Sequence, residues 1–526
     1  MRRASILLLL VAVGVAALGC GDPNQKANTL YVEACGLVES GKRAEETSYA
    51  RAADHYREAL TRVDRIIEKY PSSELAVKLA GGEGQMCGVP LTQFRELVVP
   101  LVEYKAEAEQ DVALCAFLVL KAVEPKLWSG YHDDTPKEYA LHAVAGALAA
   151  WGHGRMAINL LRECDYLKSS ATKDVAVGCA IGGEYDLALE ALNGIKSVDD
   201  ISYVMSRMAL AAARRSDYEQ AVDFASGIAD SSKRKNTYHY IAVAQAEAGD
   251  YAIAYRAANS ISDYCVAEVR TAVAIREAGL GKIEFAVAMA DTLREAGNIY
   301  LAAEIVESAS GEYAQRGEIS RSLELARSLD WGYGRVEALL KTTAASHAAG
   351  DISRSQEILD ELTAYGQSLE DGVRRALVLD RVATGYASVG DGVSASRMIT
   401  DALSSASRIE SDWEQETVIA DVAACSIIAG DMEKAYETTA DVGQPGILAM
   451  DIDEWMRRLF YYGSPADALR LAISIPEAWP LRSETVDGGY LKAMVLGRTA
   501  QEMAEEKMEI GEAEALLLHR ILRTVD

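Results

Sequence analysis

The sequence has little of what β-structured and disulfide-stabilised proteins use. Its 526 residues include ten prolines and five phenylalanines. No stretch alternates β-branched with polar residues, as a half-buried strand does. Of the eight cysteines, seven follow Cys20 at wide spacings, which is not the even-numbered set of a disulfide framework. These shortages argue against a β domain and a disulfide scaffold, and they leave a helical protein.

Basic residues are also in deficit. The chain has 53 Lys and Arg against 79 Asp and Glu, a formal net charge of −26. A chain this acidic repels phosphate backbones, so we expect no nucleic-acid partner. The charge favours basic or neutral partners, although acidic helix faces that serve solubility alone produce the same composition.

The N-terminus carries the chain's export signal. Arg2 and Arg3 precede an apolar run over residues 6–18, which is shorter than the roughly 20 residues of a membrane-spanning helix but suits a signal peptide. The run closes on Ala17-Leu18-Gly19-Cys20, which resembles the lipobox of bacterial lipoproteins. The resemblance implies that residues 1–19 are removed and that Cys20 is lipidated. Gly21 after the cysteine resembles an outer-membrane sorting signal, so we expect an outer-membrane anchor facing the periplasm.

A short phrase returns ten times after residue 140. It has a glycine, usually followed by Asp or Glu, then a small residue five places after the glycine and an apolar residue twelve places after it. Residues five, nine and twelve places after the glycine lie on one stripe of an α-helix. The register positions, spaced 31 to 40 residues apart, are Gly152, Gly183, Ser216, Gly249, Gly281, Gly317, Gly350, Gly390, Gly430 and Gly463. The repeat predicts a stack of helix pairs.

The glycine predicts the turn between the two helices of a pair. Helical patterns lie on both sides of it, and glycine accepts the left-handed conformation that ends a helix. The acid that follows begins the next helix, as a cap or through the helix dipole. We therefore assign structural turn roles to Gly249, Asp250, Gly350, Gly390 and Gly430.

This register resembles the tetratricopeptide repeat. Ile241-Ala242, Gly249-Asp250-Tyr251 and Ala254 match its pattern in order, as do Val382-Ala383, Tyr386 and Gly390-Asp391. The resemblance covers residues 140–480, although most second helices lack the family's large aromatic residue and its closing proline. It implies an all-α superhelix with a concave groove lined by first helices. The family's groove positions fall on Asn236, His239, Glu247, Arg214 and Asp380.

The flanks divide the chain further. Residues 20–88 form an expected helical hairpin, in which Tyr49, Ala52, Tyr56 and Ala59 resemble the start of tetratricopeptide lipoproteins of the outer-membrane assembly machinery. Residues 89–139 are expected to form a helical connector, 140–480 the repeat array, and 481–526 a pair of helices that caps the stack.

Patterns that would indicate catalysis or metal binding are missing or incomplete. Gly281-Lys282 lacks the first glycine and the Ser/Thr of a phosphate loop. Asp451, Asp453 and Glu454 lack the glycine and terminal glutamate of a calcium loop. We therefore expect no enzyme activity, no metal and no cofactor.

Three kinds of function remain. We expect a membrane-anchored lipoprotein that acts as a protein–protein interaction scaffold in the cell envelope and holds a protein or peptide partner in the groove. The alternatives are an envelope enzyme or ligand-binding accessory, for example in peptidoglycan metabolism, and a passive spacer. The repeated positions are expected to hold the stack together, and the specific contacts are expected at positions that do not repeat.

Overall fold

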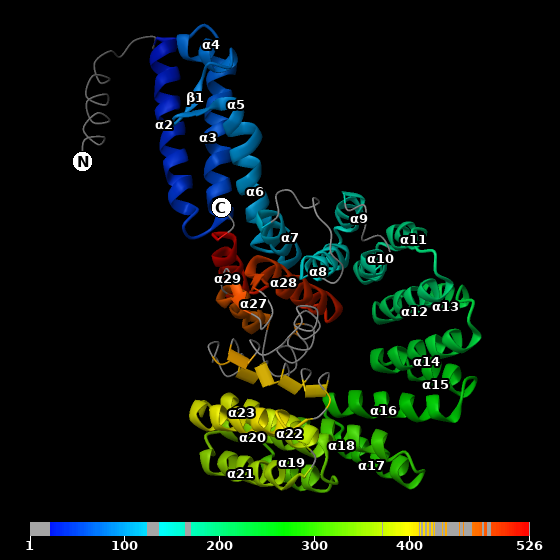
Figure 1. The fold of residues 1–526 in the computed structure, drawn as a ribbon. Coiled ribbons are helices and arrows are strands. Elements are labelled where there is room, and N and C mark those ends of the chain that lie inside the picture. The colour runs from blue at the N-terminus through cyan, green and yellow to red at the C-terminus, as the bar shows by residue number, and fades with distance from the viewer. Residues whose placement is uncertain are drawn as a thin grey trace. The chain divides into compact units, whose positions relative to one another are not determined.

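We analysed a computed structural model of the chain. It describes residues 22–123, 136–163, 170–370, 372–409, 465–475, 478–480 and 485–524, together with isolated positions between 411 and 456. Figure 1 shows an almost entirely helical chain. Its contacts divide it into two compact units. One contains residues 1–115 and 510–526, and the other contains residues 116–509.

The first unit is built on a helical hairpin. Helix α2 (Pro23–Ala44) packs on α3 (Tyr49–Lys69). The side chain of Ser48 accepts a hydrogen bond from the Arg51 amide and so caps α3. Tyr56 is buried between the two helices, where its ring lies so close to Gly41 that no larger residue fits there.

Shorter elements complete this unit. They are α4 (Glu74–Ala80), the antiparallel strands β1 (Gln85–Met86) and β2 (Val89–Pro90), α5 (Leu91–Gln93), the π-helical turn η1 (Phe94–Val98) and α6 (Val99–Ala108). The next helix, α7 (Val112–Val123), contains the boundary between the two units. The C-terminal helix α29 (Glu512–Leu522) returns to this unit and contacts α6.

A buried carboxylate joins α29 to the hairpin. Glu109, directly after α6, accepts hydrogen bonds from the backbone amides of Tyr49 at 2.6 Å and Ala50 at 3.1 Å. The same carboxylate lies 2.7 Å from Nδ1 of His519 on α29, and both side chains are at least nine-tenths buried. One side chain thus satisfies the first amides of α3 and holds the C-terminal helix.

The second unit contains eight consecutive helix pairs within the described residues. Their first helices are α8 (Pro136–Ala150), α10 (Ser170–Gly182), α12 (Val198–Arg214), α14 (Ser231–Ala248), α16 (Asp263–Gly279), α18 (Ile299–Gln315), α20 (Tyr333–Ala348) and α22 (Gly372–Ser388). Their second helices are α9 (Gly154–Glu163), α11 (Tyr185–Leu192), α13 (Tyr218–Ser226), α15 (Tyr251–Asn259), α17 (Ile283–Glu295), α19 (Ile319–Arg327), α21 (Ile352–Ser368) and α23 (Gly392–Ala406).

The pairs stack in two layers. Each first helix from α8 to α22 contacts the next first helix, and each second helix from α11 to α21 packs against its own first helix and the first helix that follows. The small residues five places after the register positions are buried in all eight pairs; Ala254, for example, has no exposed surface. The chain is therefore an all-α superhelical solenoid, as the repeat predicted.

The register positions end the first helices. From Gly152 to Gly390 all eight have φ between 64° and 99°, in the left-handed region, and Ser216 reaches it without being glycine. Gly249 is the C-cap of α14 at φ 99°. The acids that follow differ in their contacts. Asp351 and Asp391 accept backbone amide hydrogen bonds from Arg354 and Ser394, whereas Asp250 begins α15 without such a bond. Gly430 lies outside the described residues.

The C-terminal helices make more contacts than a cap at one end of the array requires. Helix α28 (Gly488–Glu505) packs on the helix before it in the sequence and also on α8 and α10, at the beginning of the array. A Cβ at Gly497 would lie 2.7 Å from the carbonyl carbon of Ala143, so this contact is backbone to backbone. Trp151 Nε1 donates to the Ala500 carbonyl at 2.7 Å. Helix α27 (Pro465–Ser474) packs on α28, and β3 (Ala478–Pro480) pairs with β4 (Thr485–Asp487) between them in the sequence.

The two compact units divide at residue 115, within the expected connector, and at residue 510, within the expected capping pair. Helix α28 therefore belongs to one unit and α29 to the other. Hydrophobic periodicity identified these helices, but it contains no information on which distant helix each one contacts.

Candidate functional site

The surface of the first helices carries a repeated pair of side chains. Three consecutive first helices, α16, α18 and α20, begin with a tyrosine that is followed four residues later by a glutamate. The pairs are Tyr264 with Glu268, Tyr300 with Glu304, and Tyr333 with Glu337. Residues four apart share one face of a helix. We call these six residues the Tyr–Glu row.

The tyrosines of the row are unusually exposed. The exposed fractions of Tyr264, Tyr300 and Tyr333 are 57%, 92% and 45%. Each tyrosine stands at the same distance from the turn glycine of its pair, so the exposure recurs with the repeat. Core packing does not require an aromatic residue at an exposed helix start, and exposed aromatic side chains in a row mark interaction surfaces.

The glutamates of the row contact side chains from neighbouring first helices. Glu268 contacts the imidazole of His239 on α14, and the buried Glu337 forms an ion pair with Arg381 on α22 at 3.1 Å. Close to the row, Glu307 on α18 binds Lys341 on α20 at 3.0 Å. These contacts join α14 to α16, α18 to α20, and α20 to α22.

Negative charge concentrates in the middle of the row. The pKa of Glu304 is raised, first by loss of hydration and then by the neighbouring carboxylates Glu307, Glu268 and Glu247. The pKa of Glu247 is raised mainly by loss of hydration, while Arg214 lowers it. Repelling carboxylates favour a cation beside them.

Three of the five groove residues expected from the sequence lie on α14, at or near this surface. Asn236 is exposed. The ring of His239 stacks on Tyr240 at 5.5 Å between centroids and meets Tyr264 edge-on at 6.1 Å. Glu247 lies at the other end of α14. Together with Tyr240, His239 continues the aromatic surface of the row onto α14.

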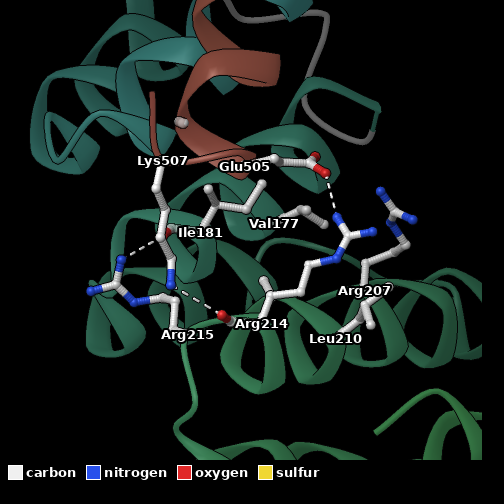
Figure 2. Close-up of a pocket in the computed structure, with 10 residues that line it drawn as sticks. Val177, Ile181, Arg207, Leu210, Arg214, Arg215, Glu505 and Lys507 are labelled. Atoms are coloured by element: carbon white, nitrogen blue, oxygen red, sulfur yellow. Dashed lines mark hydrogen bonds and ion pairs between the residues drawn. The ribbon is translucent and has the colours of Figure 1, made fainter. Parts of the chain in front are cut away.

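The other two have different surroundings. Arg214 lines a small hollow, with a cavity volume of about 30 Å³, between α10, α12 and the end of α28. Figure 2 shows it reaching Glu505, with an Nη1–Oε2 distance of 2.7 Å, while Lys507 Nζ donates to the Arg214 carbonyl at 3.2 Å. Arg214 therefore also holds the α28 segment against α12.

The expectation that Asp380 faces a partner is wrong. Asp380 is fully buried on α22. Its carbonyl accepts hydrogen bonds from Cys425 Sγ at 3.2 Å and from Thr384 Oγ1 at 3.3 Å. Cys425, from the repeat that follows α22 and α23, therefore contacts α22 at the position where the resemblance predicted an open groove.

A second surface lies beside the row, around the loop between α19 and α20. This hollow, of about 1380 Å³ including the solvent at its mouth, is lined by Tyr300 and Tyr333 of the row and by Trp331, Tyr365 and Leu369. We call it the Trp331 hollow. The indole of Trp331 is 40% exposed. It stacks on Tyr365 at 4.1 Å between ring centroids with 13° between planes.

Both surfaces were missed in the sequence, for different reasons. The sequence does contain the Tyr–Glu row, because three consecutive repeats carry it at the same distance from the turn glycine. The repeated positions, however, were expected to serve the core. The Trp331 hollow forms from a loop and from five helices, α17, α18, α20, α21 and α22, which sequence spacing does not bring together. No pattern in the sequence predicts it.

Nothing in the described residues indicates a metal centre, since no three His, Cys, Asp or Glu side chains gather there to hold an ion. Among those residues no helix is long and apolar enough to cross a membrane. Cys20, the expected lipidation site, lies outside them. What the described surface offers is exposed aromatic rings, carboxylates and guanidinium groups, which are groups that bind polypeptides.

Comparisons with known proteins add little. No family model matches the chain, and no curated protein matches it. Several solved structures match, among them one described as a circular tandem repeat protein with novel repeat topology and enhanced subunit contact surfaces, at 14% sequence identity. The match covers 95% of this chain and 96% of that chain, with a TM-score of 0.10. At that score the two backbones do not superimpose, and the solenoid assignment rests on the helices described above.

Proposed function

We propose that this protein is a tetratricopeptide-like lipoprotein of the cell envelope whose repeat array binds an extended, basic segment of a partner protein. The observation that carries this proposal is the Tyr–Glu row. It places exposed tyrosine rings at one register on three neighbouring helices, each followed four residues later by a glutamate, of which Glu304 is exposed. A repeat array uses such a surface to bind one segment across several units.

The chemistry of the row selects lysine and arginine. A cationic side chain is attracted to the face of a tyrosine ring and to a carboxylate at the same time. At the middle of the row, Tyr300 has the exposed Glu304 one helical turn away. Loss of hydration and then the neighbouring carboxylates raise the pKa of Glu304, and a cation beside it would stabilise its charged form. The net charge of −26 draws basic partners toward this surface.

The membrane anchor follows from the first residues. The lipobox-like Ala17-Leu18-Gly19-Cys20 supports lipidation of Cys20 and attachment to a membrane, with Gly21 favouring the outer membrane. Several acyl chains on one cysteine give stable attachment, whereas a single chain gives marginal attachment. Replacing Cys20→Ala should abolish palmitate labelling and release the protein from the membrane fraction; labelling that persists in this variant would refute lipidation at Cys20.

Binding is tested by partner capture from membranes with two groups of variants. Full-length protein is cross-linked in cells and purified, and the cross-linked partner segments are identified by mass spectrometry. The test variant is the double substitution Tyr300→Ala and Glu304→Gln, at two exposed positions. The matched control is Val393→Ala and Glu324→Gln, at exposed positions of the second helices α23 and α19.

We expect the captured segment to be rich in Lys or Arg and its affinity to fall about tenfold in the test variant. An exposed cation–π contact and an exposed ion pair each contribute about 0.5–1 kcal/mol. The control variant should bind as the unmodified protein does. A captured segment without basic residues, or equal binding by both variants, would refute the proposal, and capture of no partner at all would favour the spacer.

A further inference from the structure

Two cysteines of the first unit lie next to each other. Cys35 is in the middle of α2, and Cys87 is in the turn between β1 and β2. The Cys87 thiol donates a hydrogen bond to the Cys35 carbonyl at 3.7 Å, although the two residues are 52 positions apart in the sequence. Burial, and then a hydrogen bond with the Cys35 thiol, raises the pKa of Cys87 to about 12. The two sulfur atoms are therefore within reach of each other.

The backbone of the turn holds Cys87 in an uncommon conformation. Cys87 and Gly88 have φ of 48° and 90°, so both turn residues are in the left-handed region. A two-residue hairpin loop uses this conformation, but Asn or Asp followed by Gly is its usual sequence. A residue with a Cβ rarely adopts it, and surrounding contacts must hold it there. Local backbone preference thus does not explain a cysteine at this position, whereas its contact with α2 does.

A second contact holds the same turn on α2. The Tyr31 hydroxyl donates to the Gln85 carbonyl on β1, and the next residue along the strand, Met86, is fully buried. Tyr31 and Cys35 are four residues apart, so they lie on one face of α2. The turn therefore meets this face at two points one helical turn apart, which fixes its register against the helix.

We propose that Cys35 and Cys87 form a disulfide bond that joins α2 to the β1–β2 turn once the chain has been exported. Both residues are partly exposed, so a reagent that exchanges disulfides can reach them. The other cysteines of the described residues are buried; they are Cys115, Cys179, Cys265 and Cys425. This inference rests on the proposed function, because disulfides form and persist outside the reducing cytoplasm.

The oxidant is the disulfide of an oxidoreductase or of a small molecule such as oxidised glutathione. One of the two cysteines attacks that disulfide as its thiolate, forms a mixed disulfide and releases one thiol of the oxidant. The second cysteine then attacks the sulfur of the first and releases the other thiol. In all, Cys35 and Cys87 lose two electrons and two protons, and the oxidant takes up both as two thiols. The bond closes a loop that contains α3 and α4, and a long closed loop strongly restricts the unfolded chain.

Oxidation of the purified full chain tests the pairing. The chain is reduced, incubated with oxidised glutathione, alkylated and digested without reductant. Mass spectrometry should find the Cys35 and Cys87 peptides joined, lighter by two hydrogen atoms than the two separate peptides. In Cys87→Ser, Cys35 should be alkylated or glutathionylated instead, whereas the control Cys265→Ala, in the array, should keep the joined peptides. A chain in which the two peptides stay separate, or in which either joins another cysteine, would overturn this inference.

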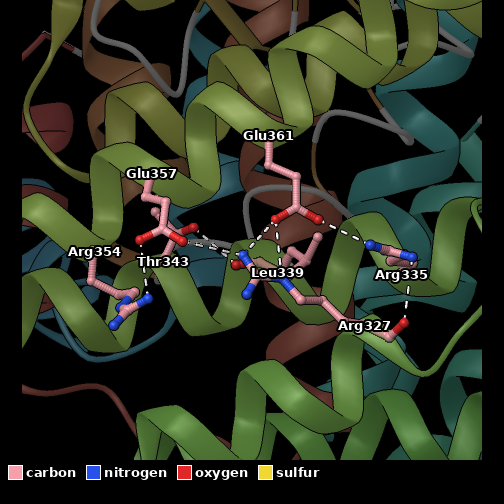
Figure 3. A network of polar contacts seen from close by, with 7 residues as sticks. All are labelled: Arg327, Arg335, Leu339, Thr343, Arg354, Glu357 and Glu361. Carbon is pink, nitrogen blue, oxygen red and sulfur yellow. Dashed lines mark hydrogen bonds and ion pairs between the residues drawn. The ribbon is translucent and has the colours of Figure 1, made fainter.

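Hydrogen exchange measures what the bond does. Oxidation should slow exchange in α2 and in the β1–β2 turn about 100-fold, which is a typical effect of a disulfide. Exchange in α21, in the other unit, is the internal reference. There Glu361 accepts hydrogen bonds from Arg327 at 2.6 Å and from Arg335 at 3.0 Å (Figure 3), and oxidation changes none of these groups. Oxidation that leaves α2 unchanged, or that changes α21 as much, would overturn the role assigned to the bond.

Trapping in cells separates this inference from the proposed function. Cells are quenched with acid, their thiols are alkylated before lysis, and the chain is digested as above. We expect the joined peptides in chains that carry palmitate on Cys20. Lipidated chains with both thiols alkylated would overturn the inference and leave the proposed function standing. Chains that form the bond when purified, but that in cells are reduced and carry no palmitate, would overturn the proposed envelope location instead.

Discussion

Replacing Glu109→Ala tests whether one buried carboxylate holds the first unit together. The substitution removes the acceptor for the Tyr49 and Ala50 amides and the partner of His519. It leaves the Tyr49 amide and the imidazole of His519 buried without this partner. A buried polar group left without its hydrogen-bond partner costs about 1–3 kcal/mol, and a lost helix cap about 1 kcal/mol, so we expect a loss of about 3 kcal/mol.

Hydrogen exchange on the full chain measures this loss locally, so the presence of a second unit does not confuse the result. A loss of about 3 kcal/mol should speed exchange in α29 and the first turn of α3 roughly 100-fold, since each 1.4 kcal/mol is tenfold. Glu107→Ala, two residues earlier and exposed, is the matched control and should change nothing. Unchanged protection of α29 in Glu109→Ala would refute the role assigned to this carboxylate.

Two further predictions concern the second unit. Gly497→Ala should lower the melting temperature of the chain, because the added Cβ would lie 2.7 Å from the Ala143 backbone and overpacking costs about 1–3 kcal/mol. The control Gly392→Ala adds a Cβ with nothing within 4 Å and should leave the melting temperature unchanged. An equal effect of the two substitutions would contradict the contact between α28 and α8. Asp391→Ala should destabilise α23 by about 1 kcal/mol at neutral pH. Hydrogen bonds from Ser394 lower the pKa of Asp391 below its unfolded value, so its stabilisation is present at neutral pH and is lost as the pH falls through the folded pKa. The melting temperatures of the unmodified and Asp391→Ala chains should therefore converge between pH 7 and pH 3. Asp391→Asn should keep most of the cap without this pH dependence. A difference in melting temperature that stays constant over this range would refute the role of the Asp391 carboxylate as the cap.

The sequence was most informative where structure depends on near neighbours. A glycine that needs a left-handed conformation and a small residue five places later are local requirements, and Gly249 and Ala254 meet them. Because every pair in the array repeats these requirements, the solenoid and its helix boundaries could be predicted without knowing any distant contact.

The site was harder to predict because it depends on what lies beside each unit. The groove positions of the repeat family predicted that Arg214 and Asp380 would face a partner. In the structure, Arg214 forms an ion pair with Glu505 of α28, and Cys425 donates to the backbone carbonyl of Asp380. The Trp331 hollow depends on a loop conformation that brings the indole onto Tyr365. By contrast, Tyr264, Tyr300 and Tyr333 could have been found by asking which repeated positions no core requires.

The return of α28 to α8 has a consequence for how the chain is made. Most contacts in a solenoid join neighbours in the sequence, so each repeat can fold as soon as the next has been synthesised. Here the bond between Trp151 and Ala500 joins residues 349 apart. The first pair of the array therefore completes its contacts only after almost the last residues have been synthesised. If the chain is exported as we propose, these contacts form only once α28 has crossed the membrane as well.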